Sequence, residues 1–140
     1  MARYLVVAHQ TADSPELLAE LRRAQADDPT STFVLLVPAT PIQHLGGWTE
    51  GESRSVAAEA GTRAQEELSR HGVQLLDVRV GDADPVEAAA DEWNLRPDYD
   101  EVILSTLPAG ISRWLKGDAT NRLTKRLDLP VKHVVAEVRR

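Results

Sequence analysis

The chain has 140 residues, of which 42% are hydrophobic and 27% are charged, so residues 1–140 fit one compact globular domain. It contains no cysteine, which excludes disulfides, cysteine-ligated zinc and thiol catalysis and favours a cytoplasmic protein. The net charge of −6 opposes nucleic-acid binding, and the apolar run near the start is too short for a signal sequence or a membrane span.

The first elements alternate between strand and helix. Residues 3–8 predict a strand buried on both faces, because an unbroken apolar run follows Arg3. Ser14 is the expected N-cap of a helix, with Pro15 in its first turn. That helix ends at the Asp-Asp-Pro segment, residues 27–29. A second continuous apolar run, residues 32–37, predicts the next strand.

A long loop over residues 38–53 separates this strand from the second helix. Trp48, beside two glycines in that loop, either folds over a ligand crevice as a lid or anchors the loop to the body of the protein. The helix that follows runs to about residue 71 and closes on Gly72. Its expected inward-facing residues are Val56, Ala60, Ala64 and Leu68.

The second half continues the alternation. Residues 73–80 predict a strand, and Asp84 caps the helix that follows it. Residues 101–105 predict a short strand, Asp118 is the expected N-cap of the last helix, and residues 131–138 predict the last strand. In the third strand, the residues expected to share one face are Leu76, Val78 and Val80.

This alternation predicts an α/β fold with three layers, in which helices cover both faces of a five-stranded parallel sheet. The third and fifth strands carry charges within their spans, as edge strands do, whereas the other three are continuously apolar. The order 3-2-1-4-5 places both charged strands at the edges, and the order 2-1-3-4-5 does not. We therefore predict the order 3-2-1-4-5.

In that order the winding of the chain reverses between strands one and four. Open α/β sheets bind ligands beyond the carboxyl ends of the strands at such a point. The residues expected there are His9, Gln10 and Thr11 after the first strand, Ser105, Thr106 and Leu107 after the fourth, and Val37 and Ala39 at the neighbouring end of the second. His9 is therefore either a ligand contact or a loop histidine satisfied by backbone or water.

Sequence motifs and side chains near this crevice restrict the chemistry that it can support. The chain lacks a phosphate-binding glycine loop, a G-x-S-x-G elbow and an H-E-x-x-H motif, and its four histidines lack metal-ligand spacing, so we expect no metal. Ser112 and Arg113 follow the fourth strand and can hold an anion, or else Ser112 caps a helix and Arg113 lies on the surface. Trp114 falls in register with Ile111 and Leu115, which favours a core position.

Three segments resemble the universal stress protein family: Gly81-Asp82-x-x-Pro85-x-x-x-Ala89, Asp100-Glu101-Val102-Ile103-Leu104, and Leu115-Lys116-Gly117-Asp118 with Leu129-Pro130-Val131. The resemblance implies the strand order argued above and a homodimer through the last strand. It also implies a nucleotide site with the motif G-x2-G-x9-G-[ST]. Aligned on Gly117, the other motif positions are Leu104, Leu107 and Asp118, so only Gly117 is retained and ATP affinity is expected to be low.

Two functions remain on these grounds. One is a stress-protein-like regulatory module that binds ATP, another adenine nucleotide or another small anion without robust turnover. The alternative is a ligand-free dimeric interaction protein on the same scaffold. An enzyme is not expected and no catalytic residue is assigned, because the sequence offers no nucleophile with both a base and a group to orient it.

Overall fold

The structure, a computed structural model, describes residues 2–41 and 50–137. Its centre is a five-stranded parallel sheet with the order β3-β2-β1-β4-β5, which confirms the predicted fold class and strand order. The strands are β1 (Arg3–Val7), β2 (Thr32–Pro38), β3 (Asp77–Gly81), β4 (Glu101–Thr106) and β5 (Val131–Val135).

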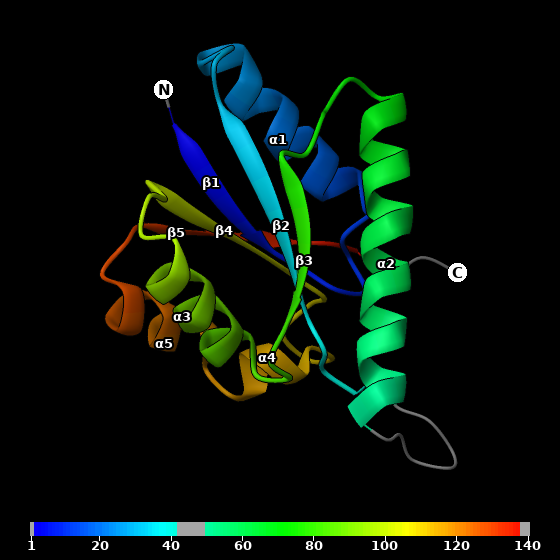
Figure 1. Cartoon of the computed structure of the whole chain (residues 1–140), viewed down its shortest axis with the longest axis vertical. Helices are drawn as coiled ribbons and strands as arrows, with labels where there is room; N and C mark the ends of the chain where they lie inside the picture. Colours follow the sequence, from blue (N-terminus) through cyan, green and yellow to red (C-terminus); the bar gives the residue numbers. More distant parts are fainter. Residues whose placement is uncertain (1, 42–49, 138–140) are drawn as a thin grey trace.

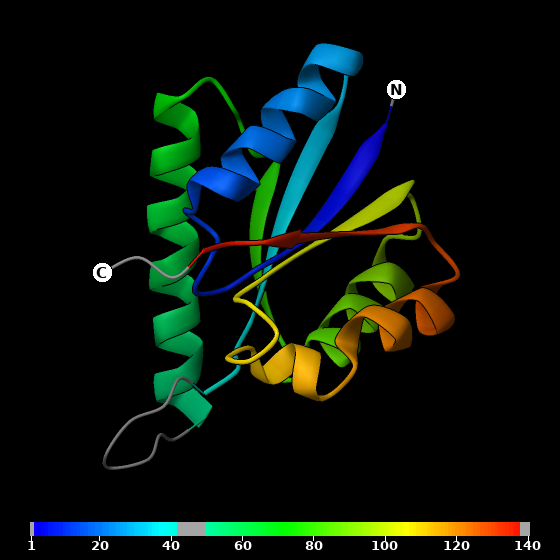
Figure 2. The same ribbon diagram turned by 180° about the vertical axis from the view of Figure 1, so that it is seen from behind.

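Helices cover both faces of this sheet, in three layers. In Figures 1 and 2, α1 and α2 lie on one side of the strands, and α3, α4 and α5 lie on the other. The helices are α1 (Pro15–Asp27), α2 (Glu50–Arg70), α3 (Pro85–Leu95), α4 (Arg113–Lys116) and α5 (Ala119–Leu127). In the part of the chain that the structure describes, no helix has the length and apolar character needed to cross a membrane.

The central strands are buried on both faces, and successive side chains contribute to different cores. Val6 packs with α1 and α2, whereas Leu5 and Val7 pack with α3 and α5. This alternation explains why Leu5, Val6 and Val7 are all apolar: both faces of β1 are covered by helices there. The predicted N-caps of α1 and α3 are present, since Ser14 accepts the N–H of Leu17 at 3.1 Å and Asp84 accepts that of Val86 at 2.8 Å.

The second helix differs from its prediction. Its described part begins at Glu50, inside the segment predicted to be a loop (residues 38–53), and Trp48 lies outside the described residues. Ala57 is fully buried and Val56 is only half-buried. The inward stripe is Ser53, Ala57, Ala60, Ala64 and Leu68. Small residues at these positions let α2 lie close to the sheet, and this requirement outweighed the larger apolar area of valine.

The two edge strands are shorter than predicted. β3 begins at Asp77, and Leu76 is 54% exposed instead of facing inward with Val78 and Val80. β5 ends at Val135. Each edge strand pairs on one side only, so fewer ladder hydrogen bonds hold its ends in extended form. Asp118 holds the N-cap position of α5, but it has a left-handed backbone, with φ of 58°, and no capping side-chain bond.

Candidate functional site

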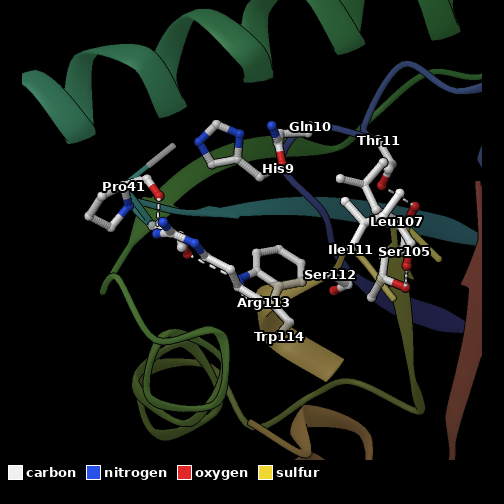
Figure 3. Close-up of a pocket in the computed structure, with 12 residues that line it drawn as sticks. His9, Gln10, Thr11, Pro41, Ser105, Leu107, Ile111, Ser112, Arg113 and Trp114 are labelled. Carbon is white, nitrogen blue, oxygen red and sulfur yellow. Dashed lines mark hydrogen bonds between the residues drawn. The ribbon is translucent and has the colours of Figure 1, made fainter. Parts of the chain in front are cut away.

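A cavity of about 160 Å³ opens at the carboxyl ends of β1 and β4, where the winding of the sheet reverses (Figure 3). Drug-sized molecules occupy pockets of roughly 300–1,000 Å³, so this volume suits a small group such as a phosphate or a sugar. Its described lining residues are His9, Gln10, Thr11, Thr40, Pro41, Ser105, Thr106, Leu107, Ile111, Ser112, Arg113 and Trp114.

Most residues that the sequence placed in the crevice line this cavity together. They are His9, Gln10, Thr11, Ser105, Thr106, Leu107, Ser112 and Arg113. Three others do not line it. Val37 and Ala39 are buried in the core on the α1 and α2 side of the sheet, because the alternation of side chains at the end of β2 turns both toward that face. Gly117 is exposed and ends α4.

Two hydroxyl groups join the ends of the central strands inside the cavity. The Oγ1 of Thr11 and the Oγ of Ser105 are 2.6 Å apart and buried. Next to them, Thr106 contacts Nε2 of His133 on β5 at 2.7 Å and the carbonyl of Leu107 at 2.8 Å. Burial lowers the pKa of His133 below its usual value. The cavity floor is therefore a row of hydroxyls held in place by neighbouring strands.

His9 forms another wall and is 94% buried, with a relative exposure of 6%. Neither ring nitrogen has a hydrogen-bond partner among the described residues. Burial, and secondarily the positive charge of Arg63 on α2, lower the pKa of the imidazole. His9 is therefore neutral at pH 7, with one N–H donor and one acceptor nitrogen unused.

The opposite wall carries the cation. Nη1 of Arg113 donates to the carbonyl of Pro41 at 3.1 Å, and Nε1 of Trp114 donates to Oγ1 of Thr40 at 3.1 Å. These bonds hold the segment after β2 against α4. No described lining residue is an aspartate or glutamate, so the site presents one guanidinium without a competing carboxylate. Such a site attracts anions.

The segment after β4 contributes both to the helix start and to the cavity. Ser112 is the N-cap of α4, accepting the N–H of Leu115 at 3.3 Å, and it also lines the cavity. Trp114 packs against the core on the α3 and α5 side and reaches the cavity as well. Leu104 is fully buried in that core and does not line the cavity, whereas Leu107 does.

Some lining residues were not predicted. Thr40, Pro41 and Ile111 come from segments that the sequence pattern assigned to a loop or to a helix face. The topology offered one usable signal, since the end of β2 lies next to β1 at the switch point. Among the described residues, no group of three or more histidine, aspartate or glutamate side chains is placed to hold a metal ion.

Comparison with known proteins adds information on the fold. No protein-family model matches the chain, and no curated protein sequence matches it. Solved structures do match. A universal stress protein from Archaeoglobus fulgidus has a TM-score of 0.63 and 15% identity, covering 96% of this chain and 93% of that one. The chain has the fold of universal stress proteins.

Two of the similar universal stress protein structures contain nucleotides. The one from Archaeoglobus fulgidus in complex with dAMP has a TM-score of 0.60 and 12% identity, with 96% and 97% of the two chains covered. One in complex with cAMP has a TM-score of 0.62 and 14% identity, again with 96% and 97% covered. The fold can therefore accommodate nucleotide ligands in other proteins, at identities too low to transfer the ligand directly.

Proposed function

We propose that this protein is a regulatory module of the universal stress protein type, which binds a nucleotide or another small anion in the cavity beyond β1 and β4. The observation that carries the proposal is the composition of the cavity: buried hydroxyls and one guanidinium, without a carboxylate among its described lining residues. The dAMP and cAMP complexes of proteins with the same fold support a nucleotide. The absence of cysteine is the basis for proposing a cytoplasmic location.

The proposed module binds without robust turnover. At the cavity, a hydroxyl and an imidazole meet in the pair of Thr106 and His133. Within the described residues, no carboxylate is hydrogen-bonded to that imidazole, and its pKa is lowered by burial. A nucleophile and its base act efficiently when a third group orients the base. The pair therefore supports a structural role more than a catalytic one.

Arg113→Ala tests the anion site. In isothermal titration calorimetry with adenine nucleotides, we expect this variant to lose about 1.5–3 kcal/mol of binding free energy, the usual range for a hydrogen bond to a charged group. Arg126→Ala is the matched control, because Arg126 is also a half-exposed arginine but pairs with Glu87 on α3. Equal affinities in all three proteins would contradict the anion site, and a wild-type protein that binds no nucleotide would contradict the proposed function.

The same titration addresses ATP. Leu107 lines the cavity at a position where the related motif has glycine, and a side chain there keeps a triphosphate from the backbone. We expect the dissociation constant for ATP to lie above the sub-micromolar range. A sub-micromolar dissociation constant for ATP would show that the site does not depend on glycine at this position.

A second candidate function, a ligand-free homodimer, is favoured by the edge strand β5. Val135 is 44% exposed at that edge. The N–H of Ala136 donates to Thr106 of β4 at 2.9 Å, so by the alternation of strand geometry the N–H of Val135 points away from the sheet. An apolar edge with free N–H groups pairs readily with a second copy about a two-fold axis.

Light scattering tests this dimer. We expect a wild-type dimer, and a monomer for Val135→Lys, which places a charge on the pairing edge. Val135→Pro should give the same result, because it removes an N–H that β4 does not use. Leu76→Lys is the control, since Leu76 is a comparably exposed apolar residue before the opposite edge strand. A wild-type mass near 15.4 kDa at micromolar concentration would contradict the dimer.

A further inference from the structure

The two edges of the sheet differ in how their backbone groups are satisfied. The edge strands β3 and β5 each pair with one neighbour, so each leaves one row of N–H and C=O groups without a strand partner. Two open rows on one chain are a hazard, because a copy can then pair at each edge and the assembly need not close. At one of the two edges, side chains occupy this row.

The outward-facing backbone groups of β3 belong to Val78 and Val80. The N–H of Ala39, which follows β2, donates to the carbonyl of Gly81 at 3.0 Å, so Gly81 directs its backbone groups toward β2. These directions alternate along a strand, so Val78 and Val80 direct theirs away from the sheet. A strand from a second copy would have to pair with these groups.

Two charged side chains contact them instead. The N–H of Val78 donates to Oδ1 of Asp77 at 2.8 Å, and the carbonyl of Val80 accepts a longer bond, of 3.5 Å, from Nη2 of Arg54. Asp77 also forms an ion pair with Arg79 at 2.7 Å, which holds the carboxylate at the strand. A pairing strand would have to displace both side chains and cover their charges with its own backbone, which is costly.

The position of α2 brings Arg54 to this edge. In Figures 1 and 2, α2 lies alongside β3. The packing is close, since a Cβ at Gly61 would lie 2.7 Å from Cγ1 of Val78. Gly61 is about two turns after Arg54 on the same helix, so the contact that needs glycine also holds Arg54 within reach of Val80.

The β5 edge has no matching cap at Val135. The N–H of that residue also points outward, and among the described residues no side chain accepts it. We propose that Asp77 and Arg54 close the β3 edge against a second copy of this chain, so that self-association is confined to the β5 edge. The inference goes beyond the proposed function: it requires no ligand, and it holds whether the wild-type protein is a monomer or a β5 dimer.

Light scattering over a range of protein concentrations tests the closed edge. The double variant Arg54→Ala/Asp77→Ala should associate reversibly, with a mass about twofold or more above that of wild type at the highest concentration and a return to the wild-type mass on dilution. Asp77→Ala alone should have a larger effect than Arg54→Ala, because its bond is the shorter one. Asp77→Asn retains an acceptor for the N–H of Val78 and should behave as wild type.

Two further variants separate an open edge from general causes of association. Arg70→Ala/Asp91→Ala removes the same two residue types from exposed positions on α2 and α3, and should keep the wild-type mass. Adding Leu76→Lys to the double variant returns a charge directly before β3, and should restore the wild-type mass.

The closed edge is wrong if the double variant keeps the wild-type mass at every concentration, or if the control on α2 and α3 associates equally. Asp77→Asn that associates like Asp77→Ala would show that the bond to Val78 does not protect the edge. Association that persists after Leu76→Lys would point to an exposed core, and urea denaturation of the same samples would then show a lowered free energy of unfolding.

Discussion

Buried polar groups at the two ends of the sheet differ in how many hydrogen-bond partners they have. Near the amino ends of the strands, Glu92 is 4% exposed, and its carboxylate accepts the hydroxyl of Tyr99 at 2.6 Å and Nη1 of Arg96 at 3.3 Å. Arg79 on the edge strand β3 adds an ion pair at 3.3 Å. At the carboxyl ends, His9 is just as buried, but its ring has no partner in the described part of the chain.

This difference separates buried polar groups that hold the fold together from buried polar groups that have no hydrogen-bond partner within the described residues. A carboxylate surrounded by donors stabilises the arrangement of the elements that supply them, here α3, the segment before β4, and β3. An imidazole without partners contributes no such stabilisation and retains its hydrogen-bonding capacity for another molecule. The comparison predicts that removing the two groups has opposite effects on stability.

Removing the carboxylate of Glu92 should have the largest effect. Glu92→Ala leaves the Tyr99 hydroxyl buried without its acceptor, removes the ion pair of Arg96 and leaves Arg79 with Asp77 alone, so the free energy of unfolding should fall by about 3 kcal/mol. Urea denaturation measures the change. Glu87→Ala, on the exposed face of the same helix, removes an exposed ion pair with Arg126 and should change stability by less than about 1 kcal/mol. Equal effects of the two variants would refute the comparison.

The hydroxyl pair of the cavity should have an intermediate effect. Ser105→Ala deprives the buried Oγ1 of Thr11 of its partner, so we expect a loss of about 1–2 kcal/mol in the free energy of unfolding. Thr62→Ala, which removes an exposed hydroxyl bonded within α2, should be nearly neutral. If Ser105→Ala has unchanged stability, the hydroxyl pair, like the His9 ring, does not stabilise the ligand-free protein.

His9→Leu should have the smallest effect, and of opposite sign. Replacing an unpartnered buried ring by an apolar side chain should raise the free energy of unfolding of the ligand-free protein by about 0.5–1 kcal/mol at pH 7.5. The same denaturation experiment measures it. A destabilised variant would mean that the ring already has a partner in the free protein.

The effect of His9→Leu should grow as the pH falls. The pKa of His9 in the folded protein is lowered, by burial first and by Arg63 second, below the value of about 6.5 that applies to an unfolded chain. Below that value the unfolded chain binds the proton more readily, so wild-type stability falls from pH 6.5 down to the folded pKa. His133, whose pKa is also lowered by burial, contributes with the same sign. A pH-independent difference between wild type and His9→Leu would contradict this explanation.

The strand order could be predicted from the sequence because the apolar or charged character of each strand indicates whether it is central or at an edge. β1, β2 and β4 have neighbours on both sides and helices on both faces, and they contain continuous apolar runs. The ends of β3 and β5 could not be predicted, since apolar residues such as Leu76 continue beyond the last pair of backbone hydrogen bonds. The hydrophobic pattern indicates which residues can be buried, whereas the backbone pairing of the strands determines which residues are buried.

The cavity was predictable only as far as the topology fixes it. Residues directly after β1 and β4 were found because strand ends at a switch point converge. Thr40 and Pro41 were missed because their places depend on bonds to Trp114 and Arg113, which are 74 and 72 residues away in the sequence. No local pattern contains such pairs, so the wall formed by the segment after β2 required the structure.

The position of β1 at the centre of the sheet also determines when the site comes into existence. Thr11 and Ser105 meet across 94 residues of sequence. During synthesis, β1 and β2 can pair early, but the other side of β1 waits until β4 has emerged. Contacts of this range form late and make folding slow. The cavity is therefore complete only after β4 has paired with β1, and a molecule bound there would stabilise the sheet in which both strands are in place.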